Sequence, residues 1–190
     1  MSQQELLTTI VGILDSTNIP YMVVGSTVSS YYGEPRSTHD IDIVIALHPN
    51  AVDSLYSGLS KLEGYVDDLA IRRALSRVGM FNYIDDGTGL KVDFWVVRDN
   101  PYDQAAFERR RREKVLGVDL MICAPEDTIL SKLRWASELG GSEKQFQDAL
   151  RVYEIQAAGL DRGYLDRWST ILGVDREWRR LLDSAQPLDS

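Results

Sequence analysis

The chain has 190 residues, of which 44% are hydrophobic and 26% are charged, and its formal net charge at neutral pH is −8. This composition is typical of a globular protein with a sizeable core, and the acidic balance argues against a surface that grips nucleic acid over its whole extent. No apolar run approaches the roughly 18 residues of a membrane helix, and the polar N-terminus is unlike a signal peptide. We therefore expect a cytoplasmic protein without membrane contact.

Helical and extended patterns alternate over the first 124 residues. Ser2 and Glu5 match a capping box, and apolar residues at helical spacing follow them, so the chain should open with a helix over residues 2–16. An apolar run over residues 21–24 predicts a buried strand. The other elements expected in this part are helices over 27–32, 49–63, 67–76 and 101–112 and a strand over 40–46. Strands over 78–84 and 90–97 should form a hairpin across the turn residues 85–89. Residues 115–118 and 120–124 should form either a short strand pair or a single bent strand.

From Pro125 onward the pattern is helical only. Pro125, followed by two acids, is a typical helix start, and helices are expected over 125–139, 142–158, 161–172 and 175–185. The expected fold class is therefore α+β. Residues 1–124 should form a small mixed β-sheet flanked by helices, and residues 125–190 a C-terminal helical portion packed on it.

The single cysteine, Cys123, lies in an apolar run. A lone cysteine in such a run is typically a small core residue, and the alternative is a reactive thiol, which no neighbouring residue would activate. No disulfide can form within the chain, which suits a reducing cytoplasm.

The strand expected over residues 40–46 begins with two carboxylates, which are unfavourable in strands. Side chains alternate between the faces of a strand, so Asp40 and Asp42 share one face, and Asp93 projects away from the apolar side of its own strand. If the two strands are neighbours, three carboxylates converge, and a divalent cation such as magnesium would offset their repulsion. The alternative is that Asp40 ends a loop, Asp42 pairs with an arginine and Asp93 is an edge-strand charge.

Gly25 and Ser26 end the first strand and lead into a short helix. Free backbone N–H groups at a helix start bind anions, glycine allows close approach of a phosphate, and Ser26 adds a hydroxyl donor. Beside a metal site this turn would become a triphosphate cradle. The alternative is an ordinary turn at Gly25 with Ser26 as helix cap.

These features occur in a familiar order. The succession of a strand, Gly25-Ser26, a short helix, Asp40-x-Asp42 and a third acid, Asp93, on a later strand resembles the DNA polymerase β-like nucleotidyltransferase superfamily. The resemblance implies a nucleotidyltransferase fold with its catalytic domain in the first 124 residues. It also implies that Asp40 and Asp42 bind two magnesium ions, that Asp93 completes the site and activates the acceptor hydroxyl, and that Gly25 and Ser26 hold the β- and γ-phosphates.

A narrower resemblance covers roughly residues 20–155. Residues 33–42 are similar to the Gly-x-x-Arg-x-Thr-x-Asp-x-Asp run of bacterial abortive-infection nucleotidyltransferases, a type IV toxin-like group. Residues 124–133, which include Lys132, and residues 144–148, which end in an aspartate, are similar to later segments of that group. Many members have Gly-Gly where this chain has Gly-Ser, and this departure removes no metal ligand.

The resemblance suggests roles for two basic residues, Arg36 and Lys132. Arg36, in the loop before the metal strand, either binds phosphate or pairs with a nearby acid. Lys132 either reaches the triphosphate or extends along the edge of an apolar helix face. The run over residues 109–112, four arginines, either ends a helix in solvent or contacts an RNA backbone or a triphosphate.

The implied reaction transfers a nucleoside monophosphate from a nucleoside triphosphate, ATP among the candidates, to an acceptor hydroxyl and releases pyrophosphate. The acceptor could be a tRNA end, a protein or a small molecule such as an aminoglycoside. The toxin-like resemblance favours a macromolecule and would bring an antitoxin as a partner. The alternative is a nucleotide-binding or partner-binding module without catalysis, against which the complete set of three acids argues.

Overall fold

The computed structural model describes residues 1–36, 38, 40–77, 79–138 and 140–186. The chain forms two compact units, of which the first comprises Met1–Val24 and Thr38–Ile122 and the second Gly25–Ser37 and Cys123–Ser190. The division expected from the sequence, at residue 124, assigned residues 25–37 to the first part, whereas they group with the C-terminal helices. Residues 37 and 39 in the motif, 78 at a strand start and 139 at a helix end lie outside the described residues.

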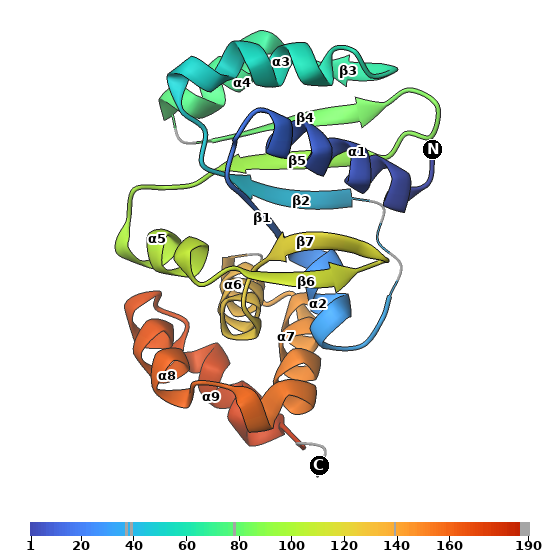
Figure 1. Ribbon diagram of the computed structural model, residues 1–190. Helices are drawn as coiled ribbons and strands as arrows, with labels where there is room; N and C mark the ends of the chain where they lie inside the picture. The colour runs from blue at the N-terminus through green and yellow to red at the C-terminus, as the bar shows by residue number, and fades with distance from the viewer. Residues whose placement is uncertain (37, 39, 78, 139, 187–190) are drawn as a thin grey trace. The chain divides into compact units, whose positions relative to one another are not determined.

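The first unit is built on a mixed sheet (Figure 1). Its described strands follow the order β3-β4-β5-β2-β1-β7-β6. β2 runs parallel to β5 and antiparallel to β1, β1 runs parallel to β7, and the remaining neighbours are antiparallel. The strand bounds are β1 Tyr21–Val24, β2 Asp40–Ile45, β3 Gly64–Val66, β4 Met80–Asp85, β5 Lys91–Val96, β6 Arg111–Val115 and β7 Val118–Ile122.

Helices pack against this sheet and against one another. α1 begins with the expected capping box, in which Ser2 Oγ accepts from the Glu5 N–H and the Glu5 carboxylate accepts from the Ser2 N–H. α1 contacts α3 and β7, and α4 contacts α3, β4 and β5. The bounds are α1 Gln3–Ser16, the 3-10 turn η1 Pro49–Ala51, α3 Val52–Leu59, α4 Asp68–Arg77 and α5 Pro101–Glu108.

The side chains of β2 alternate between a buried apolar face and a face that carries the acids. Ile41, Ile43 and Ile45 are completely buried, whereas Asp40 is exposed and Asp42 is half-buried. The apolar face of β2 therefore enters the core of the unit, and the acid-bearing face points the other way, as strand geometry predicts.

The second unit is helical (Figure 1). α6 and α7 form its centre, α2 packs on both, and α8 and α9 pack on them and on each other. The bounds are α2 Gly25–Tyr32, α6 Pro125–Glu138, α7 Glu143–Gln156, the 3-10 turn η2 Ala157–Gly159, α8 Arg162–Ile171 and α9 Asp175–Ser184. The expected α+β class, with a mixed sheet flanked by helices and helices at the C-terminal end, is confirmed.

Three sequence-based expectations were wrong. The strand expected over 115–118 is the turn of a hairpin instead, since β6 ends at Val115 and β7 begins at Val118. The helix expected over 101–112 ends at Glu108, and Arg111 already belongs to β6, because the edge of β7 offers a pairing partner that a local helix preference does not count. The helix expected to reach residue 63 ends at Leu59, and Gly64 begins the unexpected edge strand β3 beside β4. None of the described helices combines the length and apolarity needed to cross a membrane.

Candidate active site

Three carboxylates and one ammonium group lie on one face of two neighbouring strands. In the parallel pair of β2 and β5, Asp42 is in register with Asp93 and Asp40 is in register with Lys91. Register partners on adjacent strands project from the same face, about 4.8 Å apart across the sheet. Asp40, Asp42, Lys91 and Asp93 therefore form a compact block, here called the acidic cluster.

Lys91 is the cation of this cluster, and its Nζ lies 2.9 Å from Asp93 Oδ2. The hydrogen bond to Asp93 raises the pKa of Lys91, burial opposes this, and the charges of Asp93, Asp40 and Asp42 reinforce it. All three acids thus act on one ammonium group. Sequence reasoning did not predict Lys91 as a site residue. The available signal was its position two residues before Asp93, which places both side chains on the same face of the strand.

Asp93 is the most buried acid of the cluster, with 7% of the residue exposed. Its Oδ1 is buried and has no hydrogen-bond partner in the described structure. A buried carboxylate oxygen without a partner carries a desolvation penalty that a bound cation or donor would relieve. Asp93 therefore has one oxygen held by Lys91 and one that is buried without a partner.

The acidic cluster belongs to a longer row across the sheet. Asn82 of β4 is in register with Asp93, and Val24 of β1 is in register with Asp42. Asn82 brings an amide oxygen, also a ligand type that hard cations accept. Its polar side chain between two aromatic strand residues was the signal that could have marked it. Gly25 follows Val24 directly in the chain.

The donor types and the register fit a divalent metal ion. Carboxylate and amide oxygens are the ligands that magnesium takes, and Asp93 Oδ1 lacks a partner. As the side chains stand, however, no group of three or more acidic, histidine or cysteine side chains among the described residues is arranged to hold a metal ion. Lys91 pairs with Asp93 instead. The role of Asp40, Asp42 and Asp93 as metal ligands stays a prediction.

The second unit contains a polar network, here called the basic cluster: Ser26, Arg36, Lys132, Gln145 and Asp148. Arg36 donates to both oxygens of Asp148, at 3.1 and 2.8 Å, and to Ser26 Oγ at 2.6 Å. Lys132 donates to Gln145 Oε1 at 2.9 Å, to Asp148 Oδ2 at 2.8 Å and to Ser26 Oγ at 3.5 Å. The predicted residues Ser26, Arg36 and Lys132 are thus brought together around one hydroxyl.

Lys132 does not extend along a surface, because only 4% of the residue is exposed. A buried ammonium group is stable only when it is paired and hydrogen-bonded, and here all three of its hydrogens have acceptors. Burial alone would raise the pKa of Asp148, but the hydrogen bonds from Arg36 and Lys132 outweigh it and lower the pKa below its usual range. Asp148 is therefore the counter-ion of two cations.

Gln145 and Asp148 were not predicted as site residues. They lie three residues apart on α7, so they share one helix face. Asp148 ended a segment similar to the toxin-like group, and this was the available signal.

Gly25 is the first residue of α2 and has a φ of 69°, a left-handed conformation that favours glycine. No loop separates β1 from α2, so the helix begins two residues earlier than expected.

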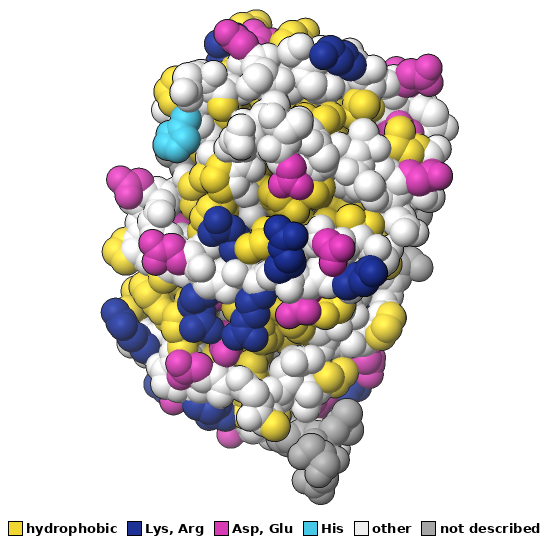
Figure 2. Space-filling view, in the orientation of Figure 1, with side chains coloured by type: hydrophobic (Ala, Val, Ile, Leu, Met, Phe, Trp, Pro, Cys, Tyr) yellow, Lys and Arg dark blue, Asp and Glu magenta, His cyan; other side chains and the backbone are white. Residues whose placement is uncertain are grey.

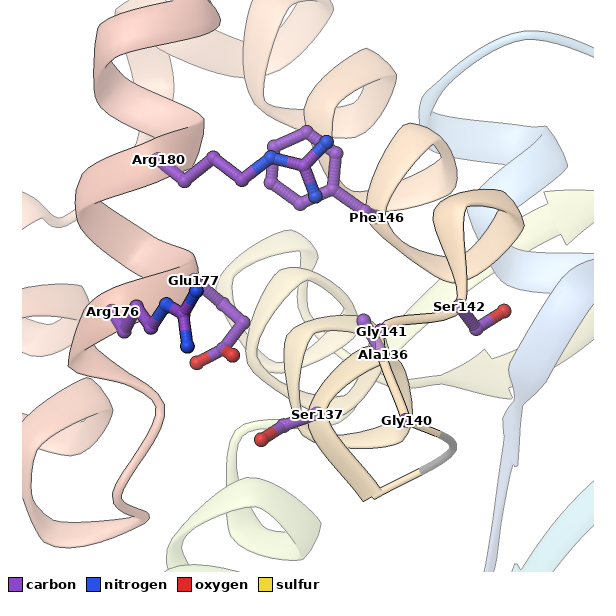
Figure 3. Close-up of a pocket in the computed structure, with 9 residues that line it drawn as sticks. All are labelled: Ala136, Ser137, Gly140, Gly141, Ser142, Phe146, Arg176, Glu177 and Arg180. Carbon is purple, nitrogen blue, oxygen red and sulfur yellow. The ribbon is translucent and has the colours of Figure 1, made fainter.

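A separate cavity of about 350 Å³ lies between the turn joining α6 to α7 and helix α9 (Figure 3). Arg180 stacks over the Phe146 ring there, with 3.8 Å from its guanidinium carbon to the ring centroid, and pairs with Glu143 at 2.8 Å. No predicted site residue lines this cavity.

The arginine run over 109–112 does not act as one surface. Arg109 caps α5, and Arg110 stacks over Phe107 and donates to its carbonyl oxygen. Arg111 and Arg112 are exposed on the edge strand β6, where Figure 2 shows lysine and arginine side chains gathered over β6 and the adjoining end of α5. Charged side chains on an edge strand discourage pairing with other chains, a role that Arg111 and Arg112 can fill without a ligand.

Comparison with known families decides the class of the protein. A family model described as nucleotidyl transferase of unknown function (DUF2204) matches residues 3–167. The chain belongs to this family. It is therefore an enzyme of the nucleotidyltransferase class, and the resemblance drawn from Asp40, Asp42 and Asp93 is confirmed at the level of the superfamily. No curated protein sequence matches the chain significantly.

Solved structures share the fold of this nucleotidyltransferase. The antibiotic-resistance factor ANT(2″)-Ia, in complex with adenylyl-2″-tobramycin, aligns with a TM-score of 0.59 at 13% identity over 93% of this chain and 99% of its own. An antigenic nucleotidyltransferase-like protein from Paracoccidioides brasiliensis aligns at 0.54 and 18% identity, over 99% and 96% of the two chains. The lincosamide antibiotic adenylyltransferase LnuA aligns at 0.52 and 16% identity, over 82% and 98%. At these identities the likeness establishes the fold.

Proposed function

We propose that this protein transfers a nucleoside monophosphate from a nucleoside triphosphate to an acceptor hydroxyl, with magnesium bound by Asp40, Asp42 and Asp93. The observation that carries the proposal is the register of β2 and β5, which sets Asp42 beside Asp93 in a family of nucleotidyl transferases. Bound magnesium would supply positive charge to the reacting phosphate and to the leaving pyrophosphate.

The chain's own residues supply binding and proton transfer. The oxygen of the acceptor hydroxyl attacks the α-phosphorus, and its proton passes to the Asp93 carboxylate. The bond from the α-phosphorus to the oxygen bridging to the β-phosphate breaks, and pyrophosphate leaves with that oxygen. Gly25, Ser26, Arg36 and Lys132 bind the triphosphate, and support for this comes from the two cations, Arg36 and Lys132, that both reach Ser26 Oγ.

A small cationic acceptor is the second candidate that an observation favours. With a net charge of −8, the chain attracts cations over its surface and repels polyanions. An adenylyl-aminoglycoside complex is known for ANT(2″)-Ia, which shares the fold. A toxin that modifies tRNA or a protein, held in check by an antitoxin, rests on the sequence motifs over residues 33–42 and 124–148.

The test is transfer from α-labelled nucleoside triphosphates in the presence of magnesium. Total tRNA, cell protein and an aminoglycoside mixture are supplied separately, and pyrophosphate release is measured in parallel. Asp42→Asn and Asp93→Asn should each lower transfer by at least about 100-fold, because the asparagine amide carries no charge to hold the metal. Asp119→Asn, at an exposed strand position in the same unit, should leave it unchanged. Nucleotide binding without transfer to any acceptor and without pyrophosphate release would reject the enzyme in favour of a binding module.

A further inference from the structure

Lys91 is paired with one of the three acids proposed to bind metal. It lies in register with Asp40 on the neighbouring strand and two residues before Asp93 on its own strand, about 6.5 Å along β5. Its side chain bridges this separation, since Nζ lies 2.9 Å from Asp93 Oδ2. One positive charge thus lies within a block of three carboxylates.

The two partners of this ion pair differ in their freedom to move. Asp93 is fixed on a central strand and its side chain is 10% exposed, whereas the Lys91 side chain is 33% exposed. Lysine has a flexible four-carbon stem and a strongly hydrated head, so its ammonium group can turn into water while the carboxylate stays in place. The cluster is therefore built with a removable cation.

We propose that Lys91 is an internal counter-cation that holds the acidic cluster together before metal binds and must leave Asp93 for a divalent ion to enter. This inference rests on the proposed function for the three acids as metal ligands. Lys91 neutralises part of their mutual repulsion in the metal-free protein, as an ion pair in a partly buried site does. Its departure would leave Oδ2 without a partner as well, so that the Asp93 carboxylate could help to hold a divalent ion.

Metal and ammonium therefore compete, and removing the ammonium should strengthen metal binding. Lys91→Met keeps the length of the stem and removes the charge. A positive charge at contact distance from a divalent ion repels it, although water and salt reduce this at a partly exposed site. We expect Lys91→Met to bind Mn²⁺ at least about fivefold more tightly than the wild type.

The experiment is calorimetric titration of the nucleotide-free protein with Mn²⁺, with circular dichroism to verify that each variant is folded. Lys91→Arg keeps the cation and should stay within about twofold of the wild type. Lys114→Met removes an equal charge from the exposed strand β6 and should also leave the affinity unchanged. Asp93→Asn should abolish tight binding.

Three results would overturn the inference. Lys91→Met could bind Mn²⁺ no more tightly than the wild type while losing stability, as expected if the ion pair only stabilises the fold. Lys114→Met could show the same gain, which would be a net-charge effect. Lys91→Met could bind no Mn²⁺ at millimolar concentration. Tighter Mn²⁺ binding by Lys91→Met without nucleotidyl transfer would instead leave this inference standing and reject the proposed reaction.

Discussion

Asp148 joins the two cations of the basic cluster, of which Lys132 is buried and Arg36 is half-buried. Its carboxylate accepts from Arg36 and from Lys132, and its side chain is only 11% exposed. Removal of one member of a buried ion pair leaves the other charge uncompensated, which is more destabilising than loss of a surface pair. A residue that sequence reasoning treated only as the end of a motif is thus the electrostatic centre of the basic cluster.

We expect Asp148→Asn to lower the free energy of unfolding by about 2–4 kcal/mol at pH 7. Because the folded state lowers the pKa of Asp148, the stabilising effect of its charge is complete above the unfolded pKa of about 3.9 and is lost as the pH falls through the folded value. Arg36 and Lys132 are the charged groups that face it. Urea titrations at pH 7, 5, 4 and 3 measure the difference.

The matched control for this prediction is Asp183→Asn, at an exposed position of α9 in the same unit. It should change stability by less than about 0.5 kcal/mol at any of these pH values. A difference between wild type and Asp148→Asn that stays constant down to pH 3 would contradict the electrostatic explanation.

At the scale of elements, Gly33 sets the approach of α2 to α7. A Cβ atom at this position would lie 2.9 Å from the Ser29 carbonyl oxygen and 3.1 Å from the Val152 backbone nitrogen. Both neighbours are backbone atoms, which cannot rotate away as a side chain can. The glycine that begins the Gly-x-x-Arg motif therefore has a packing reason: only glycine lets the two helices come this close.

Gly33→Ala should lower the free energy of unfolding by about 1–3 kcal/mol, because the helices must separate to admit the methyl group. Gly12→Ala is the matched control. Gly12 lies on the exposed side of α1, and a Cβ atom there would have no other atom within 4 Å. It should raise stability by about 0.5–1 kcal/mol by removing backbone freedom from the unfolded chain. Thermal unfolding of both variants measures this, and equal effects would show that packing at Gly33 is not tight.

The helices and strands themselves were largely predictable, and the misassigned ones show why some were not. α1, β1, β2 and the hairpin of β4 and β5 follow from local periodicity and turn residues. β6 did not, because its run of charged helix formers becomes a strand only when β7 is available to pair with it.

The whole molecule consists of two units that the chain enters more than once. The chain passes from one unit to the other after Val24, after residue 37 and after Ile122. Cys123 is therefore the residue at which the chain returns to the second unit, and its thiol is buried there, with Sγ 3.0 Å from Thr128 Oγ1. Burial raises the pKa of this thiol to about 12.

Cys123 should report the opening of the second unit. At pH 8 the native thiolate is about a thousandfold rarer than in the unfolded chain, so Ellman's reagent should label the native protein at least about 100-fold more slowly. In a Trp95→Phe variant, which retains the tryptophans of the second unit at 135, 168 and 178, labelling and fluorescence should show the same urea midpoint. Rapid labelling in native buffer would contradict this burial.

The sequence by itself determined the class of the protein and the parity of its acids. The positions of Asp40 and Asp42 on one face of a strand, and the matching parity of Asp93, follow from the period of two, which is a local property. Only the tertiary structure decided that β2 lies beside β5 with Asp42 in register with Asp93, that Lys91 pairs with Asp93, and that Asp148 joins Arg36 to Lys132. Strand order, register and contacts between distant helices depend on which surfaces bury each other, and no local pattern encodes the partner.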